Sequence, residues 1–254
     1  MIPALILAAG RGERLRPLTD ATPKPLLQVQ GKALIVWQLE ALARAGVKRV
    51  VINTAWLEEQ FPATLGDGAH FGLRIDYSIE GRDHGGALET AGGIAKALPL
   101  LGEHFWVVSG DVFVPNFQFK RTAVEAFIGS NLLAQLWLAP NAPHHPSGDF
   151  AIDAQGLAVS AAAPAHGLRP AQTGVGPRRT WASLGLFRAE LFAGIKVGTR
   201  LPLRPLLDHA MAARRLGAQA WDGGWTDVGN AERLAQADLM APVALRTADP
   251  PEPD

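Results

Sequence analysis

The chain has 254 residues and no cysteine, and its 24 basic side chains balance its 24 acidic ones. This length suits one large α/β domain or at most two small ones, and the balanced charge excludes the broad basic surface of a nucleic-acid-binding protein. The lack of cysteine excludes disulfides and cysteine-based zinc sites. No basic segment precedes the N-terminal apolar run, and no apolar stretch approaches the roughly 20 residues of a membrane span, so we expect a cytoplasmic protein.

The N-terminus begins with an apolar run, residues 3–7, that leads into a glycine- and arginine-rich segment. This order indicates a buried strand that ends in a loop. Gly10 and Gly12 lack a Cβ atom, so the backbone N–H groups around them can close on an anion. The basic residues of the loop are Arg11, Arg14, Arg16 and Lys24. The sequence therefore predicts a phosphate-binding loop.

Two common glycine-rich loops do not fit this segment. A dinucleotide-binding fingerprint needs a third small residue where this chain has Leu15. A P-loop ends in Gly-Lys-Ser/Thr, whereas this turn reads Gly12-Glu13-Arg14 and offers neither the lysine nor the hydroxyl. Both NAD binding and a P-loop ATPase are therefore disfavoured.

The first half of the chain continues with alternating helical and strand patterns. The expected elements are a helix over residues 34–43, a strand over 48–53, a helix over 57–65 and a strand over 73–77. The first of these helices stops before Gly46, and Pro62 interrupts the second. Strand, helix and strand in this order predict a parallel sheet. Residues 80–86 contain three glycines and are expected to form a mobile loop.

A further helix is expected over residues 87–98, although Gly92 and Gly93 in its middle each destabilise it by about 1 kcal/mol relative to alanine. The two glycines therefore suggest that another group approaches closely. Residues 105–109 form an apolar strand that is followed by Asp111. Because ligands of parallel sheets bind beyond the carboxyl ends of the strands, we expect Asp111 and the Gly10 loop to share one edge.

The second half is predicted to be a smaller mixed region that forms the pocket for a second, acceptor substrate. Its expected elements are a strand over 132–138, a loop over 140–148, short strands within 149–152, 156–160 and 180–187, a helix over 203–216, a turn over 221–229 and a helix over 232–239. A loose segment rich in proline and glycine covers 161–179, and 241–254 is expected to be a disordered tail. We predict one domain over 1–240, with a nucleotide-binding half over 1–130 and a half over 131–240 that binds the acceptor substrate, and no β-helix repeat.

Residues 7–19, followed by Pro23-Lys24-Pro25, resemble the L-A-A-G-x-G-x-R-x-x-P-L-T and P-K-P signature of the sugar-1-phosphate nucleotidyltransferases. The resemblance implies a Rossmann-like α/β fold, with a mostly parallel sheet flanked by helices, as in GT-A-like nucleotidyltransferases. It also implies a nucleoside triphosphate and a sugar 1-phosphate as substrates, with pyrophosphate released and Mg²⁺ as cofactor. No nucleic acid, membrane or protein partner is predicted. The attacking phosphate is ionised near pH 7, so no general base is needed.

The same resemblance assigns roles to individual residues. Arg14 would hold the β- and γ-phosphates, and Lys24 would bridge the α-phosphate and the sugar phosphate. Asp111 and Asp227 would be the metal ligands, because Trp225 to Gly229 resembles the family's W-x-D-x-G segment. The nucleotide-binding candidates are Ala8, Ala9, Gly10, Arg11, Gly12, Glu80 and Gly92, and the substrate-binding candidates are Asn53, Glu89, His144, Asp149 and Ser183. For Arg11 and Arg16, a solvated surface position stays open as an alternative.

Residues 88–93 resemble the segment with which this family reads the base. Residues 141–150 and 53–57 resemble segments of the N-acetylmuramate 1-phosphate uridylyltransferases of cell-wall sugar recycling. UTP and N-acetylmuramate 1-phosphate are therefore the favoured substrates. The alternatives are a mannose-1-phosphate guanylyltransferase or another member of the family, and a non-catalytic subunit that senses sugar nucleotides.

Two departures from the family pattern bear on this choice of substrates. The segment 80–86 is long, and Ser183 stands where relatives commonly have glycine. For His144 and His145, a surface loop without chemistry stays open as an alternative.

Overall fold

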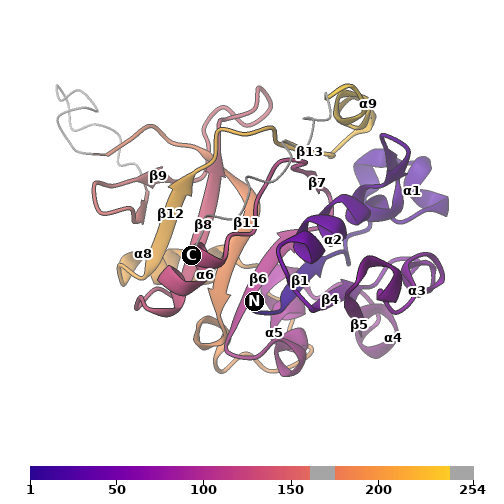
Figure 1. Cartoon of the computed structure of the whole chain (residues 1–254), viewed down its shortest axis with the longest axis horizontal. Coiled ribbons are helices and arrows are strands. Elements are labelled where there is room, and N and C mark those ends of the chain that lie inside the picture. Colours follow the sequence, from indigo (N-terminus) through magenta and orange to yellow (C-terminus); the bar gives the residue numbers. More distant parts are fainter. Residues whose placement is uncertain (161–174, 241–254) are drawn as a thin grey trace, which may run out of the picture.

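The computed structural model describes residues 1–160 and 175–240. Its main sheet contains β1 (Ala4–Leu7), β4 (Arg49–Thr54), β5 (Arg74–Ile79), β6 (His104–Ser109), β8 (Ala134–Ala139), β11 (Thr180–Arg188) and β12 (Leu216–Ala220). The spatial order is β12-β8-β11-β6-β1-β4-β5 (Figure 1). β11 is antiparallel to both of its neighbours, and the other pairs are parallel. This confirms the predicted mostly parallel α/β sheet.

Helices cover both faces of the sheet. They are α1 (Leu18–Ala21), α2 (Leu34–Arg44), α3 (Gln60–Leu65), α4 (Glu80–His84), α5 (Glu89–Leu101), α6 (Arg121–Ile128), α8 (Arg204–Ala212) and α9 (Ala231–Leu239). The apolar sides of α2, α3 and α6 pack on one face, and those of α5 and α8 pack on the other. Because both faces are covered, the strand residues Ala4, Leu5 and Ile6 are all fully buried. None of the helices within the described ranges is long and apolar enough to cross a membrane.

The helix and strand expected after the N-terminal loop are confirmed as α2 and β4. α2 ends where the sequence indicates, since Gly46 follows it with a left-handed φ of 82°. α3 is shorter than expected because it begins only at Gln60. Pro62 therefore lies in the first turn, where its missing N–H group removes no helical hydrogen bond.

Residues 80–86, expected to be a mobile loop, instead form α4 and its glycine-rich end. The helix is held by tertiary contacts, because Glu80 is fully buried and Lys96 pairs with Asp83 at 2.5 Å. Gly81 is required by close packing, since a Cβ there would lie 2.5 Å from the carbonyl oxygen of Ala55. Gly85 follows the helix with a φ of 77°.

The predicted helix over 203–216 was wrong in its last part. α8 ends at Ala212, and Arg214 takes a left-handed conformation with a φ of 55° that reverses the chain. The next residues form β12, which pairs in parallel with β8. The second half also shares the main sheet with the first, because β11 pairs with β6. The smaller mixed region is therefore limited to short additions such as β9 (Ala151–Ile152) and β10 (Ala158–Val159).

Two pairs of short strands form small sheets separate from the main one. The pair β2 (Gln28–Val29) and β3 (Lys32–Ala33) follows the N-terminal loop, while β7 (Val112–Phe113) pairs with β13 (Thr226–Asp227). In this second pair Asp227 lies opposite Val112, so the predicted turn over 221–229 contains a strand that returns beside Asp111. Most of the loose segment and the whole expected tail, residues 161–174 and 241–254, lie outside the described residues.

Candidate active site

A cavity of about 540 Å³ opens beyond the carboxyl ends of β1, β4 and β6. The strand register places Leu7 opposite Asn53 on one side and opposite Ser109 on the other. The sequence-predicted residues on its wall are Ala8, Ala9, Gly10, Arg11, Gly12, Arg14, Lys24, Asn53, Glu89 and Asp111. The sequence interpretation missed Glu13, Thr90, Ser109, Arg200 and Gly229, which also line the cavity.

The loop after β1 has one position that requires glycine. Gly12 has a φ of 70°, and a Cβ there would lie 3.0 Å from Cγ2 of Thr19. The hydroxyl of Thr19 in turn donates a hydrogen bond of 2.9 Å to the carbonyl of Gly12. At Gly10, by contrast, a Cβ would meet open space. The loop therefore keeps its shape through its own contacts and leaves room beside Gly10 for a ligand.

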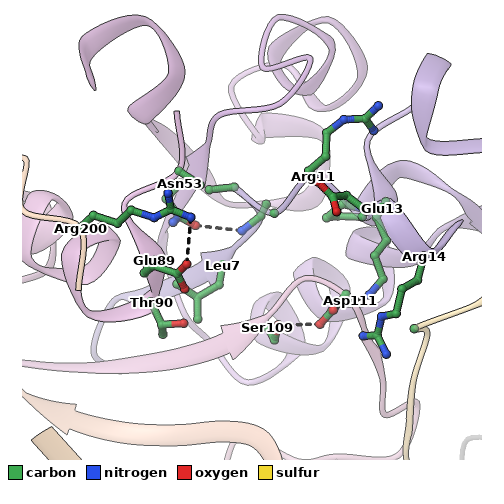
Figure 2. A pocket seen from close by; sticks show the side chains of 18 residues that line it. Leu7, Arg11, Glu13, Arg14, Asn53, Glu89, Thr90, Ser109, Asp111 and Arg200 are labelled. Carbon is green, nitrogen blue, oxygen red and sulfur yellow. Dashed lines mark hydrogen bonds and ion pairs between the residues drawn. The ribbon is translucent and has the colours of Figure 1, made fainter. Parts of the chain in front are cut away.

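Arg11 stabilises this loop through contacts on the side away from Asp111. Its guanidinium stacks on Trp56 at 3.6 Å and donates hydrogen bonds of 2.7 Å to the carbonyl of Thr19 and 2.6 Å to Asp20. Figure 2 shows the guanidinium pointing away from Asp111. Arg11 is thus neither a solvated surface charge nor a cation aimed at the centre of the cavity. Arg16 is the exposed charge of this pair, and it forms an ion pair with Asp20.

Lys24 and Asp111 form the charged centre of the cavity. Lys24 Nζ lies 2.5 Å from Asp111 Oδ2, and the Ser109 hydroxyl donates a hydrogen bond of 2.6 Å to Asp111 Oδ1. Burial raises the pKa of Asp111, but the ammonium of Lys24 and the two hydrogen bonds outweigh this effect and hold the pKa below its usual value. Arg14 is exposed on the same side of the cavity (Figure 2), and no ion pair joins it to another described residue.

Asp227, the second predicted metal ligand, is held beside the Asp111 backbone by strand pairing. Asp227 lies opposite Val112, and Val228 N donates a hydrogen bond of 2.8 Å to the carbonyl of Asp111. The carboxylate of Asp227 is held by Arg233, whose Nη1 lies 2.6 Å from both oxygens, and by His144 Nε2 at 3.1 Å. Asp227 therefore lies on a strand that pairs with β7, which begins directly after Asp111, and each aspartate is paired with its own cation.

This donor set fits a divalent cation. Mg²⁺ takes one or two protein carboxylates and completes its shell with phosphate oxygens and water. Asp227 lies opposite Val112, the residue that follows Asp111, so the two carboxylates belong to neighbouring backbone segments. No group of three or more histidine and acidic side chains that could hold a metal ion occurs among the residues described. Asp227 is not among the residues that line the cavity, and its carboxylate is bound by Arg233 and His144.

Arg233 sits between the main cavity and a second one. Its side chain is 9% exposed, and its guanidinium packs directly on Gly229, where a Cβ would leave no room for it. The second cavity, of about 620 Å³, lies between the loop that contains His144 and helix α9. His144, a substrate-binding candidate, therefore does not line the main cavity, and its contact is with Asp227.

Asn53 and Glu80 form a buried relay behind the cavity wall. Asn53 Oδ1 accepts a hydrogen bond of 2.8 Å from Ala8 N, and its Nδ2 donates one of 2.7 Å to Glu80. The other oxygen of Glu80 accepts from Leu88 N at 2.7 Å. Burial raises the pKa of Glu80 despite these two hydrogen bonds, which lower it. This corrects the expectation that Glu80 contacts the nucleotide, because it is buried behind Asn53 and acts through it.

The two helix glycines are explained by contacts within the chain. A Cβ at Gly93 would lie 2.6 Å from Glu80 Oε1 and 2.7 Å from Asn53 Nδ2. At Gly92 a Cβ would collide with the carbonyl oxygen of Thr199. Gly92 therefore does not line the cavity as a nucleotide-binding residue would.

Asp149 and Ser183 also lie away from the cavity wall. Asp149 accepts a hydrogen bond of 2.8 Å from Trp181 N and lies 3.2 Å from His145 Nε2, so it joins the loop after β8 to β11. Ser183 has a φ of 59° at an irregularity of β11. This left-handed conformation is one that favours glycine, so Ser183 stands at a strained position of the strand.

Comparisons with known proteins agree with this geometry. The sequence profile of a family described as "Nucleotidyl transferase" matches residues 3–160. The N-acetylmuramate alpha-1-phosphate uridylyltransferase of Neisseria meningitidis serogroup B is 46% identical over 244 residues, which cover 94% of this chain and 97% of that one. The protein of the same name from Caulobacter vibrioides is 35% identical over 259 residues, covering 96% and 97%. The crystal structure of HddC from Yersinia pseudotuberculosis with GMP-PN has the same fold, with a TM-score of 0.70 and 19% identity over 94% of this chain and 99% of that one.

Proposed function

This chain belongs to the nucleotidyl transferase family, and on that premise we propose that it transfers the uridylyl group of UTP to N-acetylmuramate 1-phosphate and releases pyrophosphate. The observation that carries the proposal is the cavity where the glycine loop, Lys24 and Asp111 meet at the carboxyl edge of the sheet. The choice of UTP and of the muramate sugar is supported by the two relatives of that name, which match nearly the whole chain.

The residues of the cavity suit this reaction because it brings several negative charges together. An oxygen of the sugar phosphate attacks the α-phosphorus of UTP, a new P–O bond forms, and the bond to the β-phosphate breaks so that pyrophosphate leaves. In our proposal Lys24 contacts the α-phosphate and the sugar phosphate, and Arg14 holds the departing β- and γ-phosphates. A divalent cation, Mg²⁺ in this proposal, supplies further charge neutralisation when it is bound by Asp111 and Asp227.

The charge of Lys24 is already placed before substrates bind. Its side chain is 9% exposed, and its ammonium is paired with Asp111 at 2.5 Å. Preorganised charge of this kind stabilises a transition state without further rearrangement. A cytoplasmic role in the recycling of cell-wall sugars is part of the same proposal.

The proposal is tested by measuring pyrophosphate release for UTP, GTP and dTTP, each combined with N-acetylmuramate 1-phosphate, N-acetylglucosamine 1-phosphate and mannose 1-phosphate. We expect the highest kcat/KM for UTP with the muramate sugar, and activity that requires a divalent cation. A preference for GTP with mannose 1-phosphate would overturn the substrate assignment. A chain that binds sugar nucleotides and releases no pyrophosphate with any pair would overturn the catalytic role.

A further inference from the structure

One wall of the active-site cavity is formed by a loop that docks on the N-terminus of α5. The carbonyl of Leu201 accepts hydrogen bonds from Ala91 N at 2.9 Å and Gly92 N at 3.1 Å, and Leu201 N donates one of 3.0 Å to Leu88. These bonds satisfy N–H groups in the first turn of the helix that otherwise lack a partner. The position of the neighbouring residue, Arg200, is therefore fixed by the backbone.

The glycine at position 92 is what makes this docking close. The carbonyl of Thr199 occupies the space that a Cβ of Gly92 would need. A glycine in a helix interior is destabilising by about 1 kcal/mol relative to alanine, so the close contact explains a residue that the helix itself disfavours. The contact brings Arg200 to the wall of the cavity.

The guanidinium of Arg200 lies across the cavity from the phosphate-loop cations. Figure 2 shows it beside Asn53 and Glu89, on the side opposite Arg14 and Asp111. Its Nη2 lies 3.2 Å from Glu89 Oε1, which is its one side-chain hydrogen bond to the described part of the chain. The two side chains are 73% and 46% exposed, and an ion pair with such exposure adds little to stability.

The backbone of Glu89 is strained at this point. Its φ is 61°, a left-handed conformation that is uncommon for residues other than glycine. Strained residues of this kind concentrate at functional sites, where the surrounding structure holds them in place. Because the ion pair contributes little to stability, the strain at Glu89 points to a role of the pair in the cavity.

The chemistry of the proposed substrates leaves one group without a partner. The phosphates face Arg14 and Lys24, and uracil carries no charge at neutral pH. N-acetylmuramate bears a lactyl carboxylate, which is ionised at pH 7 because such groups have pKa values of about 4. A guanidinium has five N–H donors in a planar fork that matches a carboxylate, and the contact with Glu89 uses only one of its nitrogens.

We propose that Arg200 binds the carboxylate of the acceptor sugar and that Glu89 orients the guanidinium for this contact. The inference rests on the proposed function, because only an acidic sugar phosphate offers the group that Arg200 would bind. It makes the pair Glu89 and Arg200 a determinant of acceptor specificity.

The test compares kcat/KM for N-acetylmuramate 1-phosphate and N-acetylglucosamine 1-phosphate, two sugars that differ in the lactyl group, at saturating UTP. In Arg200→Gln we expect the ratio of the two values to fall by about 10- to 100-fold, because a hydrogen bond to a charged group is lost. Arg200→Lys keeps the charge without the fork and is expected to fall between wild type and Arg200→Gln. Arg121→Gln is the matched control, because Arg121 is an exposed arginine that forms an ion pair with Glu125 on α6, outside the cavity lining.

The outcomes separate this inference from the function on which it rests. Wild-type protein that uses neither sugar, or prefers the one without the carboxylate, overturns the proposed function. Wild-type protein that prefers the acidic sugar, with the same ratio in Arg200→Gln, leaves the function standing and overturns the role of Arg200. A rise in the KM for UTP alone in Arg200→Gln also overturns it, because the arginine would then contact the nucleotide. A lower ratio in Arg200→Gln with an unchanged ratio in Arg121→Gln supports it.

Discussion

Gly93→Ala tests the buried relay behind the cavity wall. Alanine is the better helix former by about 1 kcal/mol, so propensity alone predicts a more stable protein. The structure predicts the opposite, because the new Cβ would lie 2.6 Å from Glu80 Oε1 and 2.7 Å from Asn53 Nδ2. Crowding of a packed core costs about 1–3 kcal/mol, and a lost hydrogen bond to a carboxylate about 1.5–3 kcal/mol. We therefore expect the free energy of unfolding to fall by about 1.5–5 kcal/mol.

Urea unfolding followed by tryptophan fluorescence measures this change. Gly129→Ala is the matched control, because Gly129 is exposed, has a φ of −73°, and its Cβ would come no closer than 3.5 Å to the nearest atom. That variant is expected to gain about 0.4–1 kcal/mol at most. Gly93→Ala should also raise the KM for UTP, because Asn53 would no longer hold Ala8 N in place. A Gly93→Ala protein as stable as wild type would refute the tight packing of the Asn53–Glu80 pair.

Three further predictions follow from the ion pairs of the structure. Asp111→Asn is expected to reduce turnover by about 100-fold or more, since its carboxylate neutralises charge in the reaction, and near-normal turnover would remove Asp111 from the site. The urea midpoint of this variant should also fall, because Lys24 is 9% exposed and loses its charged partner. Gly229→Ala should displace the guanidinium of Arg233 from Asp227. We expect the concentration of Mn²⁺ needed for half-maximal binding, measured by electron paramagnetic resonance in the presence of nucleotide, to rise by about 10- to 100-fold. Unchanged Mn²⁺ binding would show that Arg233 does not position Asp227. Hydrogen bonds from Arg82 and Lys96 lower the pKa of Asp83 to about 2, whereas an unfolded aspartate has a pKa of about 4. The ionised carboxylate of Asp83 therefore stabilises the fold above pH 4, and this stabilisation is lost as the pH falls toward 2. Asp83→Asn should flatten the loss of stability between pH 4 and pH 2 in thermal unfolding curves, and an unaltered profile would contradict the ion pairing.

The sequence was most informative where a local motif also determines the local structure. The glycine loop needs Gly12 in a left-handed conformation, and Lys24 and Asp111 come together because the strands before them are parallel neighbours. A parallel sheet brings the carboxyl ends of its strands to one edge, so a few short motifs could place residues far apart in the chain at the same cavity. The predicted α/β fold was confirmed for the same reason.

The features that the sequence did not reveal depend on contacts between distant segments. α4 contains Gly81, is followed by two more glycines and has no helical pattern of its own. It is held by the burial of Glu80 and the pairing of Asp83 with Lys96. After Leu216, β12 contains only glycine, alanine and glutamine, which have weak strand preference, and its pairing with β8 decides its conformation. Arg200 belongs to no recognisable motif, and its position depends on the docking of its loop on α5.

β13 is synthesised after every strand of the main sheet. The seventh strand of the main sheet ends at Ala220, whereas Asp227 lies on a two-residue strand beyond it and its partner Arg233 lies later still, on α9. A nascent chain released as far as Ala220 contains every strand of the sheet, the glycine loop, Lys24 and Asp111, yet it lacks the second carboxylate. The neighbouring placement of the two aspartates is therefore completed only by the residues that follow the main sheet in the chain, because Asp227 and Arg233 both come after Ala220.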